Sequence, residues 1–119
     1  MKKSELYNFI DKYSGVALLV DEHSVVIYHN NNIFNYQWYD DPIVGCNISN
    51  LFLNNSKNIG PLAYAQALNC LEKDRICWLT QEAIFNTEYY ENILYTTIRI
   101  IVKVESKEYL LLLIDEASE

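Results

Sequence analysis

Two histidines and four carboxylates, residue types that can bind a metal ion, lie close to one another in the sequence. They are His23, His29, Asp21, Glu22, Asp40 and Asp41. A metal site needs ligands that converge on one point. His23 falls in a predicted polar turn and His29 at the end of a predicted strand, so the two imidazoles share no helix face. We therefore interpret these side chains as solvated turn residues and predict no metal site.

No catalytic motif accompanies them. Gly15, Gly45 and Gly60 are isolated, so the sequence has no glycine-rich loop that could bind phosphate. Serine, histidine and aspartate all occur, but not in a nucleophile-elbow setting. The carboxylates form no apolar-flanked pair of the kind used in acid–base catalysis. We predict that the chain is not an enzyme.

Composition excludes other function classes. The chain has 119 residues, 50% of them hydrophobic, and a formal net charge of −7. This length favours one domain, and the apolar fraction argues against disorder. Binding to nucleic acid or anionic lipid needs clustered Lys and Arg, and only Lys2 and Lys3 are adjacent here. We predict no nucleic-acid binding and no membrane contact by this chain.

The number and spacing of the cysteines indicate the cellular compartment of the protein. Cys46, Cys70 and Cys77 are odd in number and show no C-x-x-C spacing. The N-terminal residues lack the apolar segment of a secretion signal, and no apolar run approaches the length of a membrane span. We expect reduced thiols and a cytoplasmic location.

Two apolar runs are candidates for central strands. Residues 16–20 form the first, and a polar turn at 21–24 leads into a second β-rich run at 25–28. Only residues 109–114 (YLLLLI) match the first run. A strand that is apolar on both faces must be covered on both faces. We predict that residues 16–20 and 109–114 lie together in the middle of one sheet.

An amphipathic helix is predicted over residues 4–13. Its apolar stripe consists of Leu6, Phe9, Ile10 and Tyr13. Ser4 is the expected N-cap, and Gly15 is expected to end the helix. In the simplest interpretation this stripe packs on the helix's own domain.

A helical region follows the second strand. An Asn side chain at position 30 or 31 is expected to cap a short helix within residues 30–39, and residues 49–53 form a single helical turn. Residues 54–58 (NNSKN) are predicted as a polar loop. Pro61 begins the longest helix, which reaches about Arg75. The apolar stripe expected on that helix is Tyr64, Ala65, Leu68 and Leu71.

The C-terminal part is predicted as three strands. The first covers residues 76–85 and ends in a turn at 86–88, and the second covers 94–105 with a clear period of two. One set of its side chains is Ile98, Ile100, Val102 and Val104, and the other is Thr97, Arg99, Lys103 and Glu105. We expect the polar set to face solvent. Two strands, helices and then three strands indicate an α+β domain with an antiparallel sheet.

The chain resembles a PAS domain, a small sensory module of signalling proteins. The residues that carry the resemblance are Val16–Val20, Asp21, Tyr28-His29-Asn30, Ile43-Val44-Gly45, 48–52 (ISNLF) and 115–119 (DEASE). Each motif is degenerate alone, and the resemblance depends on the order and spacing of the motifs. Together they cover roughly residues 15–119.

This resemblance implies a PAS-like five-stranded antiparallel sheet with short helices inserted between strands 2 and 3, plus the N-terminal amphipathic helix. The first and last strands would be neighbours, and the helices would enclose a pocket against one sheet face. We expect residues 1–14 to flank the domain and residues 15–119 to form it. A GAF-like fold is the alternative, and a helix between the last two strands would contradict the PAS prediction.

Two cofactors of the PAS family are not expected here. Light-oxygen-voltage domains form a flavin adduct at the cysteine of Gly-x-Asn-Cys-Arg-Phe-Leu. In the corresponding stretch, 45–51 (GCNISNL), Ile48 takes the reactive position and Cys46 lies two residues earlier. Haem-binding members usually use a histidine of the long helix, and the helix predicted from Pro61 has none. We predict neither photoreactive flavin nor haem, and a small buried thiol at Cys70.

Ring side chains indicate a pocket for a small apolar or aromatic ligand. The candidate lining residues are Phe34, Trp38, Leu51, Phe52, Tyr64, Leu68, Trp78 and Tyr95. Rings with few fixed charges suit such a ligand. The same residues could instead fill a solid core, and the sequence does not distinguish the two.

The leading hypothesis is a sensory and regulatory module of a larger signalling or transcription-regulating protein. A ligand would stabilise one arrangement of the sheet and its flanking helices. The resemblance also implies a homodimer contact through Leu6, Phe9, Ile10 and Tyr13. An output domain or partner protein would lie outside this chain. The alternative is a purely structural dimerisation domain without a ligand.

Overall fold

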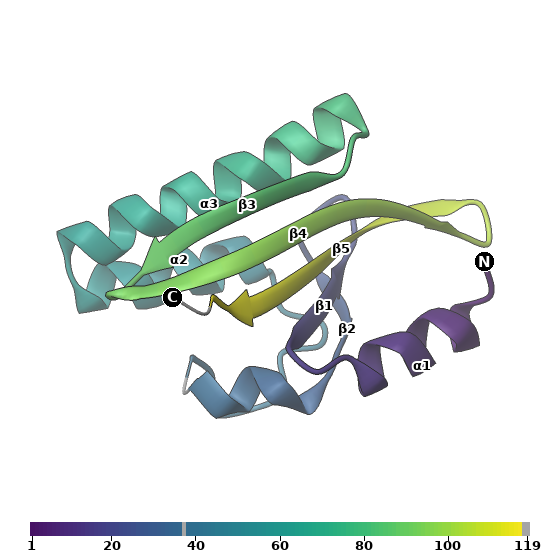
Figure 1. Cartoon of the computed structure of the whole chain (residues 1–119), viewed down its shortest axis with the longest axis horizontal. Helices are drawn as coiled ribbons and strands as arrows, with labels where there is room; N and C mark the ends of the chain where they lie inside the picture. Colours follow the sequence, from purple (N-terminus) through teal and green to yellow (C-terminus); the bar gives the residue numbers. More distant parts are fainter. Residues whose placement is uncertain (37, 118–119) are drawn as a thin grey trace.

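The fold is an antiparallel sheet with helices on both faces (Figure 1). A computed structural model describes residues 1–36 and 38–117. The elements in chain order are α1 Lys3–Lys12, β1 Val16–Val20, β2 Val26–His29, the 3₁₀ helix η1 Asn31–Tyr36, α2 Ile48–Ile59, α3 Pro61–Thr80, β3 Ile84–Tyr90, β4 Ile93–Val104 and β5 Lys107–Glu116.

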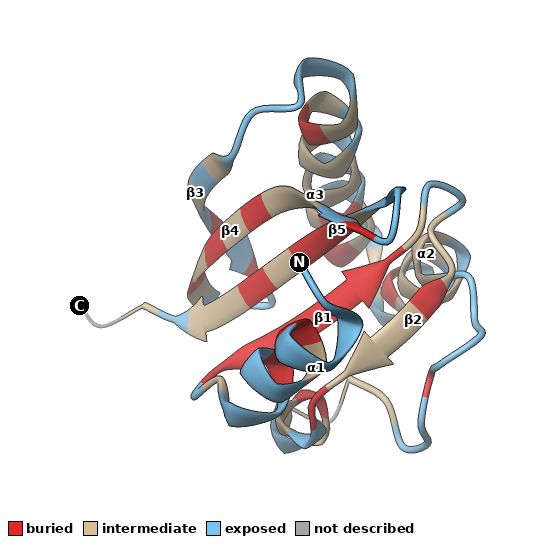
Figure 2. Cartoon of the chain, turned by 90° about the vertical axis from the view of Figure 1, so that its right-hand side faces the viewer, coloured by how far each residue is buried: buried red, intermediate tan, exposed pale blue. Residues whose placement is uncertain are grey.

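The sheet has five strands in the order β2-β1-β5-β4-β3, and every neighbouring pair is antiparallel. The first strand pairs with the last, from Val16 opposite Ile114 to Val20 opposite Leu110. All of β1 is buried, as Figure 2 shows. The predicted fold class is therefore confirmed, including the central position of the two apolar runs.

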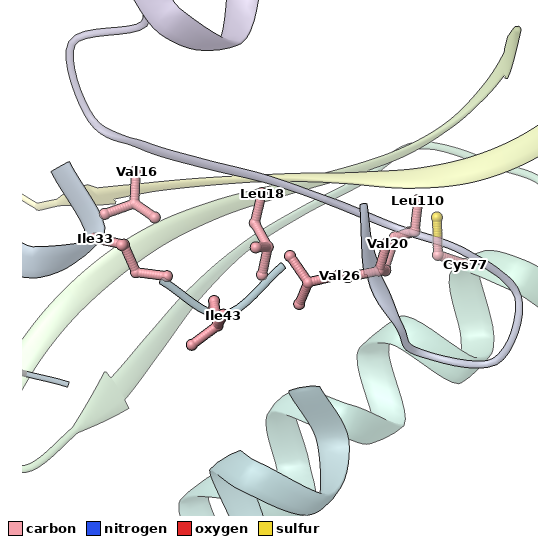
Figure 3. Packing of buried hydrophobic residues seen from close by; sticks show 8 residues of the cluster. All are labelled: Val16, Leu18, Val20, Val26, Ile33, Ile43, Cys77 and Leu110. Atoms are coloured by element: carbon pink, nitrogen blue, oxygen red, sulfur yellow. The ribbon is translucent and has the colours of Figure 1, made fainter. Parts of the chain in front are cut away.

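Alternation along the strands divides the core between the two faces of the sheet. Ala17 and Leu19 point toward α1, which covers β1 and β2 with Leu6 and Ile10. On the opposite face lies a cluster of Val16, Leu18, Val20, Val26, Ile33, Ile43, Cys77 and Leu110 (Figure 3). η1, α2 and α3 cover this second face, and the candidate functional site lies there.

The N-terminal helix packs on its own sheet. Leu6 and Ile10 are buried, whereas Phe9 is 46% exposed. Lys2 is the N-cap and makes no side-chain capping bond, so the prediction of Ser4 as N-cap was wrong. The predicted dimer contact stays a prediction, and the side chains already packed on the sheet have little surface left to offer a partner.

The junction of α1, β1 and β5 explains why position 15 is glycine. A Cβ atom there would lie 2.2 Å from Asp115 Oδ1 and 2.5 Å from the Ile114 carbonyl oxygen. The Tyr13 hydroxyl donates a short hydrogen bond to Asp115 Oδ2 at the same place. Burial and this hydrogen bond raise the pKa of Tyr13 to about 12.

We expect Tyr13→Phe to lower the free energy of unfolding by about 1–2 kcal/mol, because it removes a partly buried hydrogen bond to a carboxylate. Tyr28→Phe is the matched control, since Tyr28 donates a 2.7 Å bond to Asp11 at an exposed position. The control should change stability by less than about 0.5 kcal/mol. Urea unfolding of both variants checks the difference, and equal losses would contradict it.

The helices between β2 and β3 differ from the prediction. Residues 49–53 belong to a longer helix, α2, which continues through the predicted loop at 54–58. The Asn47 side chain caps α2 by accepting from the Asn50 N–H at 3.0 Å. Ser56 is buried within it and shares a 2.8 Å hydrogen bond with the Tyr90 hydroxyl. Packing against the sheet thus outweighs the low helix propensity of the Asn-rich segment.

The boundary between α3 and β3 was also predicted wrongly. The helix continues to Thr80, so much of the predicted strand at 76–85 is helical. The strand itself runs through the predicted turn at 86–88, and the chain turns at Glu91 and Asn92, both with positive φ. Cys77 is buried in the second-face cluster, which fixes the last turns of α3 against the sheet.

The face of β4 that was expected to be wet is buried in the first half of the strand, whereas Lys103 and Glu105 beyond it are exposed as predicted. Tyr95, Thr97 and Arg99 are at most 4% exposed, and Arg99 ranks first by volume among the fully buried side chains. They point to the face covered by α2 and α3, whereas Ile98 and Val102 pack on the α1 side. This exchange of faces places charged residues inside the domain.

Candidate functional site

A cavity of about 100 Å³ lies between the sheet and the helices of its second face. One part of its wall is apolar and comes from strand residues such as Leu110 and Leu112. The other part is polar and contains Cys70, Asp74, Glu88, Thr97 and Arg99. An apolar cavity of roughly 150 Å³ is large enough for benzene. At about two thirds of that volume, this cavity has room for a molecule smaller than benzene or for several water molecules.

Three elements bring the charged residues together. Arg99 and Thr97 alternate on β4, and Glu88 lies on the same face of the neighbouring strand β3. Cys70 and Asp74 are one helical turn apart on α3, facing the sheet.

The Arg99 guanidinium is the centre of this cluster. Its Nε donates to Asp74 Oδ1 at 2.5 Å. Its Nη1 donates to Glu88 Oε2 at 3.3 Å and to Thr97 Oγ1 at 3.0 Å. Its Nη2 donates to the Cys70 carbonyl oxygen at 3.1 Å and to Glu88 Oε2 at 3.4 Å. A guanidinium has five N–H groups, so Arg99 has no donor left for a ligand.

One carboxylate oxygen in the cluster lacks a donor. Glu88 is 6% exposed, and its Oε1 is buried without a hydrogen-bond partner among the described residues. Arg99 Nη2 lies 3.3 Å from Oε1, but its N–H groups point to other acceptors. A buried acceptor without a donor is unfavourable, so this oxygen is a position where a bound molecule would gain free energy.

Burial changes the protonation behaviour around the cluster. It raises the pKa of the Asp74 carboxyl, although the Arg99 guanidinium acts in the opposite direction. It also raises the pKa of the Cys70 thiol to about 12, with the nearby Glu88 carboxylate adding to the effect. The Cys70 thiol therefore stays protonated at neutral pH.

Aromatic side chains border the cavity. The Trp38 ring stacks on Tyr36 at 4.8 Å between centroids and meets Tyr95 edge-on at 5.6 Å. Phe52 packs against Tyr90 at 5.2 Å, and both line the cavity. These contacts fix the rings with little rotational freedom, so the apolar wall is formed before any ligand arrives.

The predicted pocket residues are only partly brought together. Trp38, Phe52 and Tyr95 line the cavity. Phe34, Leu51 and Trp78 do not line the cavity. They pack on the hydrophobic cluster of the second sheet face that Figure 3 shows. On α3, Tyr64 is half-buried and Leu68 is 45% exposed.

The face of α3 that meets the sheet differs from the predicted stripe, of which Leu71 alone lines the cavity. It carries small and polar residues, namely Ala63, Ala67, Cys70, Asp74 and Cys77. They recur at alternating intervals of four and three, the spacing of a buried helix face. Asp74, Glu88 and Arg99 were missed because charged side chains are ordinarily exposed. The spacing on α3 is the one signal in the sequence that could have indicated Asp74.

The cysteines differ in access, which gives a chemical test. Cys46 is exposed, Cys77 is buried, and Cys70 is half-buried with a raised pKa. We expect iodoacetamide at neutral pH to alkylate Cys46 first, and Cys70 and Cys77 only after unfolding, because the thiolate is the reactive form. Peptide mass spectrometry with and without urea measures this order. Rapid labelling of Cys70 in the folded chain would contradict the buried position of the cluster.

The two histidines have separate surroundings. His29 Nε2 accepts from the Ile43 N–H at 3.3 Å, and its Nδ1 lies 2.9 Å from the Asn30 carbonyl oxygen. This ring therefore joins β2 to the loop before α2. His23 is exposed beside Glu22. In residues 1–36 and 38–117, no group of three or more His, Cys, Asp or Glu side chains could hold a metal ion.

No helix within the described ranges combines the length and the apolar character needed to cross a membrane. Ile48, which the resemblance to light-oxygen-voltage domains placed at the position of their reactive cysteine, lines the cavity. Cys46 lies outside it on an exposed turn. The absence of flavin and haem remains a prediction.

Comparison with known proteins gives matches in structure only. No protein-family model and no curated protein matches the sequence. The PAS domain of Bordetella pertussis BvgS is 12% identical with a TM-score of 0.67, covering 98% of this chain and 86% of that one. A sensory box sensor histidine kinase from Vibrio cholerae is 16% identical with a TM-score of 0.66, covering 98% and 93%.

A third similar structure is the PAS domain of an HTR-like protein from Haloarcula marismortui. It is 13% identical with a TM-score of 0.59, and the match covers 96% of this chain and 90% of that one. The structural similarity establishes the fold, whereas sequence identity this low leaves activity and ligands open. With its strand order, its inserted helices and these structural matches, the chain has the fold of a PAS domain.

Proposed function

We propose that this chain is a sensory module that binds a small molecule in the cavity of its second sheet face and regulates a larger signalling protein. The observation that carries the proposal is the cavity, which combines a preformed aromatic wall with a buried acceptor lacking a donor. A solid core would leave no space beside that acceptor for a ligand. The similar chains from a sensor kinase and from BvgS support the sensory class by analogy of fold.

The route from ligand to output would run along β5. Leu110, Leu112 and Ile114 line the cavity, and the next residue, Asp115, accepts the hydrogen bond from Tyr13 at the end of α1. A ligand that binds one arrangement of β5 more tightly than another would shift the equilibrium between them. Both flanking segments would then move relative to the sheet. An output domain or partner outside this chain would respond.

The second candidate function is a dimerisation domain without a ligand. On the sheet face away from α2 and α3, Phe85 is 73% exposed and Tyr89 is 57% exposed. Both lie on β3, at the edge of the sheet, and none of the helices within residues 1–36 and 38–117 covers this part of the face (Figure 2). Large exposed rings on an open face favour contact with a second surface. A homodimer is compatible with both candidates.

Native mass spectrometry of the purified chain, with a denatured control, tests both candidates. A noncovalent adduct that disappears on denaturation supports the ligand-binding module and gives the mass of its ligand. A dimer without an adduct, together with an unchanged melting temperature across a panel of small aromatic compounds, favours the dimerisation domain. A monomer without an adduct and without any ligand-induced shift would contradict both.

A further inference from the structure

The hydrogen-bonding pattern of the charged cluster limits what the cavity can bind. Every N–H group of Arg99 already has an acceptor. A ligand carboxylate or phosphate would therefore meet no free donor on the guanidinium. It would also face Glu88 and Asp74, whose carboxylates repel an anion. The cluster, although it contains an arginine, is not built as an anion site.

The atom of the cluster that can still bind a ligand is a hydrogen-bond acceptor. Glu88 Oε2 takes the hydrogen bonds from Nη1 and Nη2 of Arg99, which orients the carboxylate and leaves Oε1 without a donor among the residues that the structure describes. Oε1 is buried, and Glu88 lines the cavity. A ligand N–H or O–H would find a charged acceptor there, and such hydrogen bonds are stronger than neutral ones.

The rest of the cavity sets the ligand's size and polarity. Tyr95, Phe52 and Leu112 offer apolar surface. The cavity has about 100 Å³, against roughly 150 Å³ for a cavity that holds benzene, so it limits the ligand to a ring smaller than benzene. We propose that the cavity binds a neutral, ring-sized molecule that donates one N–H or O–H hydrogen bond to Glu88 Oε1. This inference rests on the proposed ligand-binding function and adds the chemical class of the ligand.

Pyrrole and furan are a matched pair of probes for this inference. Both are five-membered aromatic rings of similar size, and only pyrrole carries an N–H donor. We expect pyrrole to bind at least about tenfold more tightly than furan, which is the ratio that one charge-assisted hydrogen bond provides. Dissociation constants come from ¹H–¹⁵N NMR titrations of the whole chain. Shifts should centre on the cavity residues of β3, β4 and α3.

Glu88→Gln tests the acceptor directly. Because Arg99 donates to Oε2, the amide oxygen of the glutamine would take that place and its NH₂ would take the place of Oε1. The cavity would then present a donor, so the preference for pyrrole should disappear. Glu82→Gln, at an exposed position that does not line the cavity, is the control and should keep the preference.

The possible outcomes test the inference about the ligand's chemistry separately from the proposed ligand-binding function. Equal binding of pyrrole and furan to the unsubstituted chain overturns the inference, as expected if water serves Oε1, but leaves a ligand-binding cavity in place. A preference that persists in Glu88→Gln overturns it as well. Binding of neither probe contradicts both the inference and the proposed function. If Glu88→Gln does not fold, the ratio measured on the unsubstituted chain still decides.

Discussion

Replacing Arg99 by methionine is expected to lower the free energy of unfolding at neutral pH by about 3–5 kcal/mol. Arg99 is fully buried and lies between Asp74 and Glu88. Methionine fills much of the same volume but leaves both carboxylates without their cation. It also removes the donors to Thr97 Oγ1 and the Cys70 carbonyl oxygen. Natural domains of this size have about 5–15 kcal/mol in total, so the loss would be large.

The pH dependence distinguishes this explanation from simple loss of packing. A buried carboxylate without a cation resists ionisation, so its pKa in the folded variant would lie above the unfolded value of about 4. Ionisation then opposes folding at higher pH, and protonation relieves the penalty as the pH falls. We expect the stability gap between Arg99→Met and the unsubstituted chain to narrow as the pH falls toward about 4. Urea unfolding across this range measures it.

Neutralising the partners should rescue the variant. The triple substitution Arg99→Met with Asp74→Asn and Glu88→Gln removes all three charges, and we expect it to regain most of the stability lost at neutral pH. Arg75→Met is the control, because Arg75 pairs with Glu72 at an exposed position and surface pairs contribute little. A gap that is independent of pH and unaffected by neutralisation would contradict the role assigned to the cluster.

The sheet could be predicted from the sequence because its signal is local and strong. Residues 16–20 and 109–114 are apolar on both faces, and only a central pair of strands buries both faces of each. The period of two in β4 was also correct. However, alternation alone does not say which face is inside. Burial of Arg99 depends on carboxylates from α3 and β3, which only the folded chain brings together.

The candidate site was harder to predict for the same reason. Large rings were assumed to line the cavity, and Trp38, Phe52 and Tyr95 do so. On α3 that assumption selected Tyr64 and Leu68, which lie outside the cavity wall. Small side chains face the sheet there, since Ala63 and Ala67 allow the helix to approach closely. Contact between the elements, and not residue size, decided which face of the helix was buried.

Asn30 is the other position where we expect a large effect. It is 4% exposed, and its Nδ2 donates to the carbonyl oxygens of Ile10 at 3.1 Å and Gly15 at 2.9 Å. Its Oδ1 accepts from the Ala17 N–H at 3.2 Å. One amide thus joins the end of α1, the start of β1 and the end of β2. It does so instead of capping η1, the role predicted from the sequence for Asn30 or Asn31.

Asn30→Asp should therefore lower the free energy of unfolding by about 3 kcal/mol at neutral pH, because a charged acceptor would face carbonyl oxygens in a buried position. Protonation of the new carboxyl would restore one donor, so the loss should shrink as the pH falls toward about 4. Asn35→Asp, at an exposed position in the same segment, is the control and should have little effect. Urea unfolding at both pH values gives the comparison. If both variants lost equal stability, the amide of Asn30 would not be the joint between the N-terminal helix and the sheet, and a signal along β5 would need another route to α1.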